Sequence, residues 1–390
     1  MTPAARLQAA IEILDEVIAA ARNEGAPADS IVTRYFKARR YAGSKDRRAV
    51  RELVFRAIRR IAERPVSGRA AMLGLTEDDP ALAGLFGELR GPSSIEIGEE
   101  AAAASLIPEW LQAELSPLVS PEEWPALLER APLDLRVNIA RTSREAMLAA
   151  FEGAEATPLC PWGIRLRPES KVNDHPSFED GLVEVQDEGS QLIALACLAG
   201  GERILDLCAG AGGKALAIAA ADPAATILAA DTNRARLSKL PARAERAGAA
   251  IEPRLINPGC ELEMLPDWAG QADLVLVDAP CSGSGTWRRN PEGRWRLTPE
   301  RLDRVVALQK RLLHVAAQLV RPGGAIVYAV CSILAREGAG QAADFLARHA
   351  SWVSSATPIP AGRLDGQGRL LTPGHDGTDG FFVARLESPC

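Results

Sequence analysis

Two cysteines in the last third of the chain carry its clearest chemical signal. Cys281 follows an apolar stretch at 273–277 that predicts a buried strand, and Asp278 ends that stretch. Cys331 directly follows a second apolar stretch at 325–330. If these strands are neighbours in a parallel sheet, all three side chains lie at its carboxyl-terminal edge, where ligands bind in open α/β folds. One strand-end cysteine is usually a packing residue, but two beside an acid favour catalysis.

Two thiols and an acid next to a methyl donor suit methylation at carbon 5 of a pyrimidine. Addition of a thiolate to carbon 6 makes carbon 5 nucleophilic, an acid near ring nitrogen 3 stabilises the developing charge, and a second thiol assists elimination. Asp278 would need a raised pKa to donate a proton there. The residues alone leave open which thiol attacks, because DNA enzymes with this chemistry take the nucleophile from a Pro-Cys pair such as the one containing Cys281.

A glycine-rich turn in ILDLCAGAGGKALAIA (204–219) is the candidate cofactor site. Gly210, Gly212 and Gly213 allow a ligand to approach the backbone at the start of a helix. Asp231 ends the next strand, where a carboxylate can accept ribose hydroxyls. The spacing is not that of the dinucleotide fingerprint. Nucleotides, flavins and S-adenosylmethionine all use such turns, a tight turn without a ligand also fits, and Asp206 is equally suited to hold the loop through backbone N–H groups.

Strands and helices alternate from about residue 186, which predicts a doubly wound, Rossmann-like α/β sheet. The expected strands are 203–207, 226–230, 251–256, 273–277, 325–330 and 381–386. One helix is expected to begin at Lys214, and three others are expected at 235–247, 299–320 and 341–349. The segment Arg321-Pro322-Gly323-Gly324 is expected to stop the long helix.

The first part of the chain predicts two further regions. Apolar residues recur at helical spacing over residues 1–75, Asp46 is expected to cap one helix, and prolines break the pattern up to residue 132. Strand-like pieces at 135–140, 163–168 and 182–187 surround a helix near 143–151. The expected domains are an all-α domain with its connection at 1–130, a small α/β (RRM-like) unit at 131–185, and a methyltransferase domain at 186–390.

Two basic stretches predict contact with RNA, although the net charge is −6. Eleven Lys and Arg residues lie between Arg34 and Arg60, and eight lie between Arg288 and Arg311. Dense local positive charge binds a phosphate backbone, and Trp287 and Trp295 in the second stretch are candidates for stacking on bases. A solvated helix face is the alternative for each stretch.

Composition excludes several other classes. The seven cysteines include no C-x-x-C pair and there are four histidines, so we expect no metal site and no disulfide framework. No apolar run reaches the roughly 18 residues that span a bilayer. We therefore expect a cytoplasmic protein that does not contact membranes. The sequence leaves the oligomeric state open, and a monomer is favoured.

The motifs resemble those of the Sun (Fmu) family of RNA cytosine-5 methyltransferases, in particular the branch of ribosomal small-subunit methyltransferase B type. The matching segments cover about the final 200 residues: VQDEGSQL (185–192), DLCAGAGGK (206–214), DAPCSGSGTWRRNPEGRW (278–295), RPGG (321–324), YAVCSI (328–333) and DGFFVARL (379–386). The segment SKDRRAVRELVFRAIRR (44–60) resembles, more loosely, the NusB-like RNA-binding domain of that branch.

This resemblance implies a role for each site residue. Cys331 is the nucleophile, Cys281 promotes release of methylated RNA, Asp278 contacts the base, and Lys214 belongs to the catalytic region. S-adenosylmethionine would be held by Cys208, Ala209, Gly210, Ala211, Gly212, Gly213, Lys214, Asp231, Asn257 and Asp278. Asn257 replaces the acid usual in the family, which puts cofactor affinity in doubt.

Ribosomal RNA of the small subunit (16S) is the expected substrate. Transfer RNA with the same chemistry, DNA, and a non-catalytic RNA-binding assembly role are the alternatives. Retention of both cysteines with Asp278 and Lys214 favours catalysis over the assembly role, and Asn257 keeps that role open.

Overall fold

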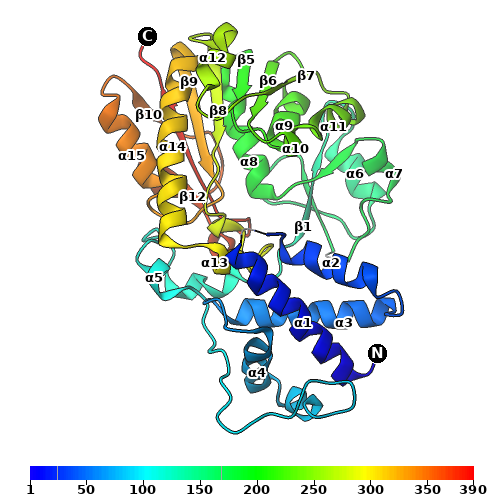
Figure 1. Cartoon of the computed structure of the whole chain (residues 1–390). Coiled ribbons are helices and arrows are strands. Elements are labelled where there is room, and N and C mark those ends of the chain that lie inside the picture. Colours follow the sequence, from blue (N-terminus) through cyan, green and yellow to red (C-terminus); the bar gives the residue numbers. More distant parts are fainter. Residues whose placement is uncertain (24, 168) are drawn as a thin grey trace. The chain divides into compact units, whose positions relative to one another are not determined.

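The computed structural model describes residues 1–23, 25–167 and 169–390 (Figure 1). The chain folds into two compact units. The first, here called the helical unit, contains Met1–Glu114, Trp124–Glu129 and Thr286–Pro299. The second, here called the sheet unit, contains Leu115–Glu123, Arg130–Gly285 and Glu300–Cys390.

Four long helices form the helical unit. They are α1 (Pro3–Arg22), α2 (Ala28–Ala38), α3 (Ser44–Arg60) and α4 (Gly68–Asp78), followed by the short elements η1 (Pro80–Leu85), α5 (Glu109–Gln112), η3 (Pro125–Leu127) and α13 (Gly293–Arg296). The apolar residues spaced along 7–18 and 50–58 are largely buried in one core, which confirms the helical pattern. Gly43 is the N-cap of α3, and Asp46 lies within its first turn, where its carboxylate accepts the Gly43 N–H at 3.2 Å. Asp46 therefore satisfies a helix-start donor from inside the helix, not from the cap position.

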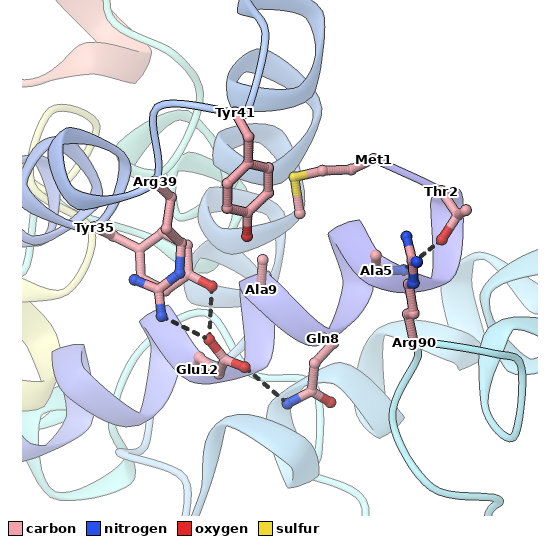
Figure 2. Close-up of a pocket in the computed structure, with 10 residues that line it drawn as sticks. All are labelled: Met1, Thr2, Ala5, Gln8, Ala9, Glu12, Tyr35, Arg39, Tyr41 and Arg90. Carbon is pink, nitrogen blue, oxygen red and sulfur yellow. Dashed lines mark hydrogen bonds and ion pairs between the residues drawn. The ribbon is translucent and has the colours of Figure 1, made fainter.

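A cavity of about 560 Å³ lies beside α1 in this unit (Figure 2). The Tyr35 hydroxyl donates to the Glu12 carboxylate at 2.6 Å, and the Arg39 guanidinium stacks 3.6 Å from the centre of the Tyr35 ring. Tyr41 also lines the cavity, and 75% of it is exposed. The cavity is therefore lined by one exposed aromatic ring, Tyr41, and by the stacked pair of Tyr35 and Arg39.

The segment 286–299 packs into the core of the helical unit. Trp295 is 2% exposed and its Nε1 donates to the Ile61 carbonyl at 2.9 Å. Trp287 is 1% exposed, and Arg288 and Arg294 are buried as well. The expectation that these tryptophans stack on bases is therefore wrong, because their large apolar area is already removed from water.

The sheet unit begins with a four-stranded antiparallel sheet. Its strands are β1 (Leu133–Val137), β2 (Glu155–Ala156), β3 (Gly163–Leu166) and β4 (Val183–Val185), in the order β2-β3-β1-β4. Helices α6 (Arg144–Ala150) and α7 (Pro176–Glu179) belong to the same region. The expected strands and helix are present, and Pro168, at the end of one expected strand, lies outside the described residues.

A nine-stranded sheet forms the rest of the unit, in the order β11-β12-β13-β9-β8-β5-β6-β7, with β10 paired to β13. Its strands are β5 (Arg203–Asp206), β6 (Thr226–Asp231), β7 (Ile251–Leu255), β8 (Ala272–Asp278), β9 (Val320–Val330), β10 (Val353–Ser355), β11 (Arg363–Asp365), β12 (Gly368–Leu371) and β13 (Phe381–Glu387). The five strands β5 to β9 are parallel, and the others are antiparallel. This is the mixed α/β, Rossmann-like sheet that the alternating pattern predicts.

Helices cover both faces of this sheet. They are α8 (Glu188–Cys197), α9 (Gly213–Ala221), α10 (Arg234–Leu237), α11 (Leu240–Ala247), α12 (Glu261–Met264), α14 (Pro299–Leu319), α15 (Ala339–Arg348) and α16 (Pro373–Asp376), with the 3-10 turns η2 (Pro121–Glu123), η4 (Leu198–Gly200), η5 (Pro266–Trp268) and η6 (Ser284–Thr286). In Figure 1, α8, α9 and α11 lie to the right of β8 and β9, and α14 and α15 lie to the left. Side chains of α8, α9 and α11 share a core with alternate residues of the parallel strands.

Three details differ from the sequence prediction. The expected helix 235–247 is two helices, α10 and α11. The long helix α14 ends at Leu319, just before the Arg-Pro-Gly-Gly segment, as expected, but strand β9 starts at Val320 and not at residue 325, so that segment lies in the strand beside an irregular register. The short strands β10, β11 and β12 were not predicted, because each has only three or four residues, too few to show a strand period.

Candidate functional site

The two cysteines of interest meet at the ends of neighbouring strands. Strands β8 and β9 are parallel, with Val277 opposite Tyr328 and Asp278 opposite Ala329. Cys281 follows β8 by three residues and Cys331 follows β9 by one, and their Sγ atoms are 3.2 Å apart. Both side chains are partly exposed. The structure thus brings two thiols into contact at the carboxyl-terminal edge of the sheet.

Cys281 is held as a neutral thiol. The contact with Cys331 and burial together raise its pKa well above the usual value for a cysteine. A thiol that keeps its proton can donate a hydrogen bond to the neighbouring sulfur.

Lys214 and Asp278 form an ion pair beside the thiols. The Lys214 Nζ atom lies 2.6 Å from Asp278 Oδ2. Burial lowers the pKa of Lys214, but the Asp278 carboxylate outweighs this effect and the net shift is upward. Lys214 is therefore a cation at neutral pH, and it donates a hydrogen bond to Asp278.

The glycine-rich turn lies between β5 and α9 on the same edge. The Gly210 N–H donates to Asp231 Oδ2 at 2.6 Å, and the Asn233 N–H donates to Asp231 Oδ1 at 2.6 Å. Gly210 and Gly212 have φ angles of +59° and +79°, a region that disfavours other residues. Asp231, predicted as a cofactor ligand, thus also holds the turn in place, although each carboxylate oxygen can accept a further bond.

The remaining predicted cofactor residues differ in their surroundings. Burial raises the pKa of the Cys208 thiol well above the usual value, so this cysteine is not reactive. Burial, and then the charge of Asp278, raise the pKa of Asp206 to about 7. Asn257 is exposed just beyond β7, the strand that pairs with β6.

Two arginines that the sequence prediction missed support the turn from behind. Arg136 Nη1 donates to the Gly213 carbonyl at 2.6 Å and to Gln186 Oε1 at 2.9 Å. Arg243 donates to the Ala211 carbonyl at 2.5 Å. Burial lowers the pKa of Arg136 to about 10, so it remains charged at neutral pH. A single arginine in a short strand gives no sequence signal for such a long-range contact.

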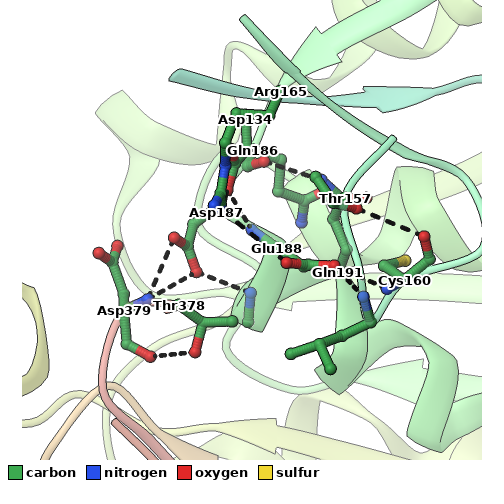
Figure 3. Close-up of polar contacts among 12 residues, drawn as sticks. Asp134, Thr157, Cys160, Arg165, Gln186, Asp187, Glu188, Gln191, Thr378 and Asp379 are labelled. Carbon is green, nitrogen blue, oxygen red and sulfur yellow. Dashed lines mark hydrogen bonds and ion pairs between the residues drawn. The ribbon is translucent and has the colours of Figure 1, made fainter. Parts of the chain in front are cut away.

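The segment VQDEGSQL anchors this support (Figure 3). The buried Glu188 carboxylate accepts the N–H groups of Leu159 and Cys160, both at 2.7 Å. Asp187 accepts the Asp379 N–H at 3.2 Å, just before β13. The segment therefore joins the small sheet, α8 and the start of β13, and its role in the described contacts is structural.

Sequence comparisons identify the family of this chain. The sequence profile of the family described as 16S rRNA methyltransferase RsmB/F matches residues 193–387. The chain belongs to this family. Ribosomal RNA small subunit methyltransferase B of Enterobacter sp. (strain 638) is 36% identical over 299 residues, which are 72% of this chain. The match spans 66% of that relative, just under two thirds of its length.

Solved structures share the fold. PH0851 superposes with a TM-score of 0.75 at 21% identity, covering 100% of this chain and 99% of that one. NSun6 from Pyrococcus horikoshii, solved with SFG, gives a TM-score of 0.63 at 18% identity, with 72% and 97% covered. Among the described residues, no helix is long and apolar enough to cross a membrane, and no cluster of side chains suits a metal ion.

Proposed function

We propose that this chain transfers a methyl group from S-adenosylmethionine to carbon 5 of a cytosine in RNA, and that its substrate is 16S ribosomal RNA. The contact of 3.2 Å between Cys281 and Cys331, beside the Lys214–Asp278 pair, carries the proposal. Membership of the RsmB/F family supports the choice of substrate.

The residues around the glycine-rich turn fit S-adenosylmethionine. A Cβ atom added at Gly213 would meet no heavy atom closer than the Gln186 amide nitrogen at 3.8 Å, so there is space for a ligand against the backbone. The N-terminus of the nine-residue helix α9 starts there, and Asp231 lies at the adjacent strand end. Residues 208–214, Asp231, Asn257 and Asp278 would hold the cofactor, which supplies an electrophilic methyl group.

Each reacting residue has a defined task in this scheme. The Cys331 thiolate adds to carbon 6 of the cytosine, while Asp278 contacts ring nitrogen 3 and Lys214 supplies positive charge beside it. After methylation, water takes the carbon 5 proton, and the electron pair of that C–H bond forms the double bond between carbons 5 and 6. The bond between carbon 6 and sulfur breaks, and its electron pair returns to Cys331. The neutral Cys281 thiol stabilises the departing sulfur by a hydrogen bond.

Trapping of the covalent adduct tests this scheme. Cys331→Ala should form no RNA adduct and lose methylation, whereas Cys281→Ala should accumulate an adduct that survives denaturing electrophoresis. Cys390→Ala, at an exposed cysteine, is the matched control and should behave as wild type. The reverse pattern would exchange the two assignments, and wild-type activity in both variants would end the proposal. Bisulfite sequencing of RNA from a deletion strain would then separate ribosomal from transfer RNA.

The helical unit is proposed to be NusB-like and to bind RNA through the turn between α2 and α3. Four exposed cations lie in or beside this turn: Lys37 near the end of α2, Arg40 in the turn itself, and Lys45 and Arg48 in the first two turns of α3. No ion pair is described for them within 1–23, 25–167 and 169–390. Arg34 and Arg51, by contrast, pair with Glu16 and Asp29. Tyr41 offers a ring for base stacking next to these cations. We refer to Lys37, Arg40, Tyr41, Lys45 and Arg48 as the exposed basic turn.

A further inference from the structure

One buried carboxylate accepts hydrogen bonds from the residue that follows each of the two cysteines. Glu337, in the turn between β9 and α15, is 0% exposed. Its Oε1 accepts the Ser282 N–H at 2.8 Å, and its Oε2 accepts the Ser332 hydroxyl at 2.6 Å. Ser282 follows Cys281 and Ser332 follows Cys331. Glu337 thus holds the residue next to each of the two cysteines.

Gln309 holds the other side of Cys281. Its Nε2 donates to the Pro280 carbonyl at 3.0 Å and to Glu337 Oε1 at 2.8 Å. It comes from the long helix α14 and is 0% exposed. The backbone on both sides of Cys281 is therefore fixed, by Gln309 before it and by Glu337 after it.

Three serine hydroxyls form a chain of hydrogen bonds between the loop after β8 and the loop after β9. The Ser282 hydroxyl donates to Ser284 Oγ at 3.0 Å, and Ser284 and Ser332 are in contact at 3.0 Å. Because the Ser332 hydroxyl donates its only proton to Glu337 Oε2, it accepts the hydrogen bond from the Ser284 hydroxyl. The Gly285 N–H also donates to the Cys331 carbonyl at 3.0 Å.

We propose that Glu337 is a positioning residue that sets the separation of Cys281 and Cys331 by orienting the loops that carry them. This inference rests on the proposed function for its importance in catalysis, but the geometry itself can be tested without RNA. A shift of about 1 Å between reacting groups can lower a rate by about 100-fold.

The variant Glu337→Gln tests the proposal, because an amide has the same shape but only one acceptor oxygen, so it cannot accept both the Ser282 N–H and the Ser332 hydroxyl. We expect kcat to fall by about 10-fold to 100-fold, with the KM for S-adenosylmethionine changed less than about 2-fold, since the cofactor turn is untouched. Glu123→Gln is the matched control. Glu123 also accepts a hydroxyl, from Thr372 at 2.6 Å, and pairs with Arg363, away from the thiols.

Oxidative cross-linking of the full-length protein reads the thiol geometry directly. An azodicarboxamide oxidant accepts two electrons and two protons as Cys281 and Cys331 lose their protons and form one disulfide bond. Wild type and Glu123→Gln should cross-link at equal rates, and Glu337→Gln should do so about 10-fold more slowly, the lower of the two factors expected for kcat. Ser332→Ala should also be slower, and the double variant should be no slower than the worse single variant, because both changes break one network.

The outcomes separate this proposal from the catalytic one. Unchanged cross-linking and kcat in Glu337→Gln would overturn the positioning role. Slower cross-linking in an enzyme whose wild type forms no RNA adduct would keep the positioning role and remove the proposed function. If Glu337→Gln does not fold, Ser332→Ala and Gln309→Leu carry the same comparison.

Discussion

The two basic stretches of the chain differ in how far their cations are exposed to solvent. In the exposed basic turn, the cations face solvent with no described ion pair among residues 1–23, 25–167 and 169–390. In the segment 286–299, Arg294 is 2% exposed, and its guanidinium donates to the carbonyls of Ile58, Arg59, Leu106 and Pro291 at 2.5 to 3.2 Å. Local charge density therefore does not tell a binding surface from a buried structural cation. The partners of each guanidinium do.

The cost of burying the Arg294 guanidinium is offset by its hydrogen bonds to backbone carbonyls. Ile58 and Arg59 lie in the last turn of α3, whose carbonyls have no partner within the helix. A cation is also favoured at a helix C-terminus. Burial lowers the pKa of Arg294 to about 9, so it is still charged at neutral pH. Arg294 thus acts as a cap that arrives from a distant part of the sequence.

The largest effect should come from Trp295→Ala. Because this ring is buried in the helical core and bonded to Ile61, its removal should lower the free energy of unfolding by about 4 kcal/mol. Thermal and urea unfolding followed by circular dichroism measure the loss. Tyr41→Ala is the control at an exposed ring and should unfold as wild type does. A normally stable Trp295→Ala that binds RNA weakly would restore the stacking role rejected above.

Arg294→Met should have the next largest effect. It keeps the apolar stem but leaves buried carbonyls without donors, which should cost about 3 kcal/mol. Arg294→Lys should be nearly as unstable, because an ammonium cannot reach the four carbonyls together. Arg48→Met, in the exposed basic turn, is the control for urea unfolding. Equal stability of the two Met variants would mean that the buried guanidinium contributes nothing.

The sequence predicts the carboxyl-terminal edge of the parallel strands better than it predicts the segment 286–299 that follows. Asp278, Cys281 and Cys331 were expected to meet, because neighbouring parallel strands place their carboxyl ends together, and the pairing of β8 with β9 does so. Trp295 was expected at the surface, because its neighbours in sequence are charged. Its neighbours in space are Ile61 and the helical core, more than two hundred residues away in the chain.

Long-range contacts account for the missed residues as well. Arg136 contacts Gly213, and Glu337 contacts Ser282, which lie 77 and 55 residues away in the chain. Neither Arg136 nor Glu337 belongs to a pattern with a helical or strand period. The glycine-rich turn itself was predicted because its glycines lie close together in sequence. Residues that hold such a turn from behind have no comparable local signal.

The smallest effect, and the sharpest test of the contrast, comes from the exposed basic turn. Lys37→Ala with Arg40→Ala should leave unfolding unchanged and weaken binding to a 16S RNA fragment, since each lost phosphate contact reduces the salt dependence of log K by about 0.7 to 0.9. For the loss of both cations, we expect the slope of log K against log salt concentration to fall in magnitude by about 1.5. Arg34→Ala with Arg51→Ala removes the same charge from residues already paired with Glu16 and Asp29, so it should lower the slope less. An identical slope for the two double variants would mean that total charge, and not its exposure, decides where RNA binds.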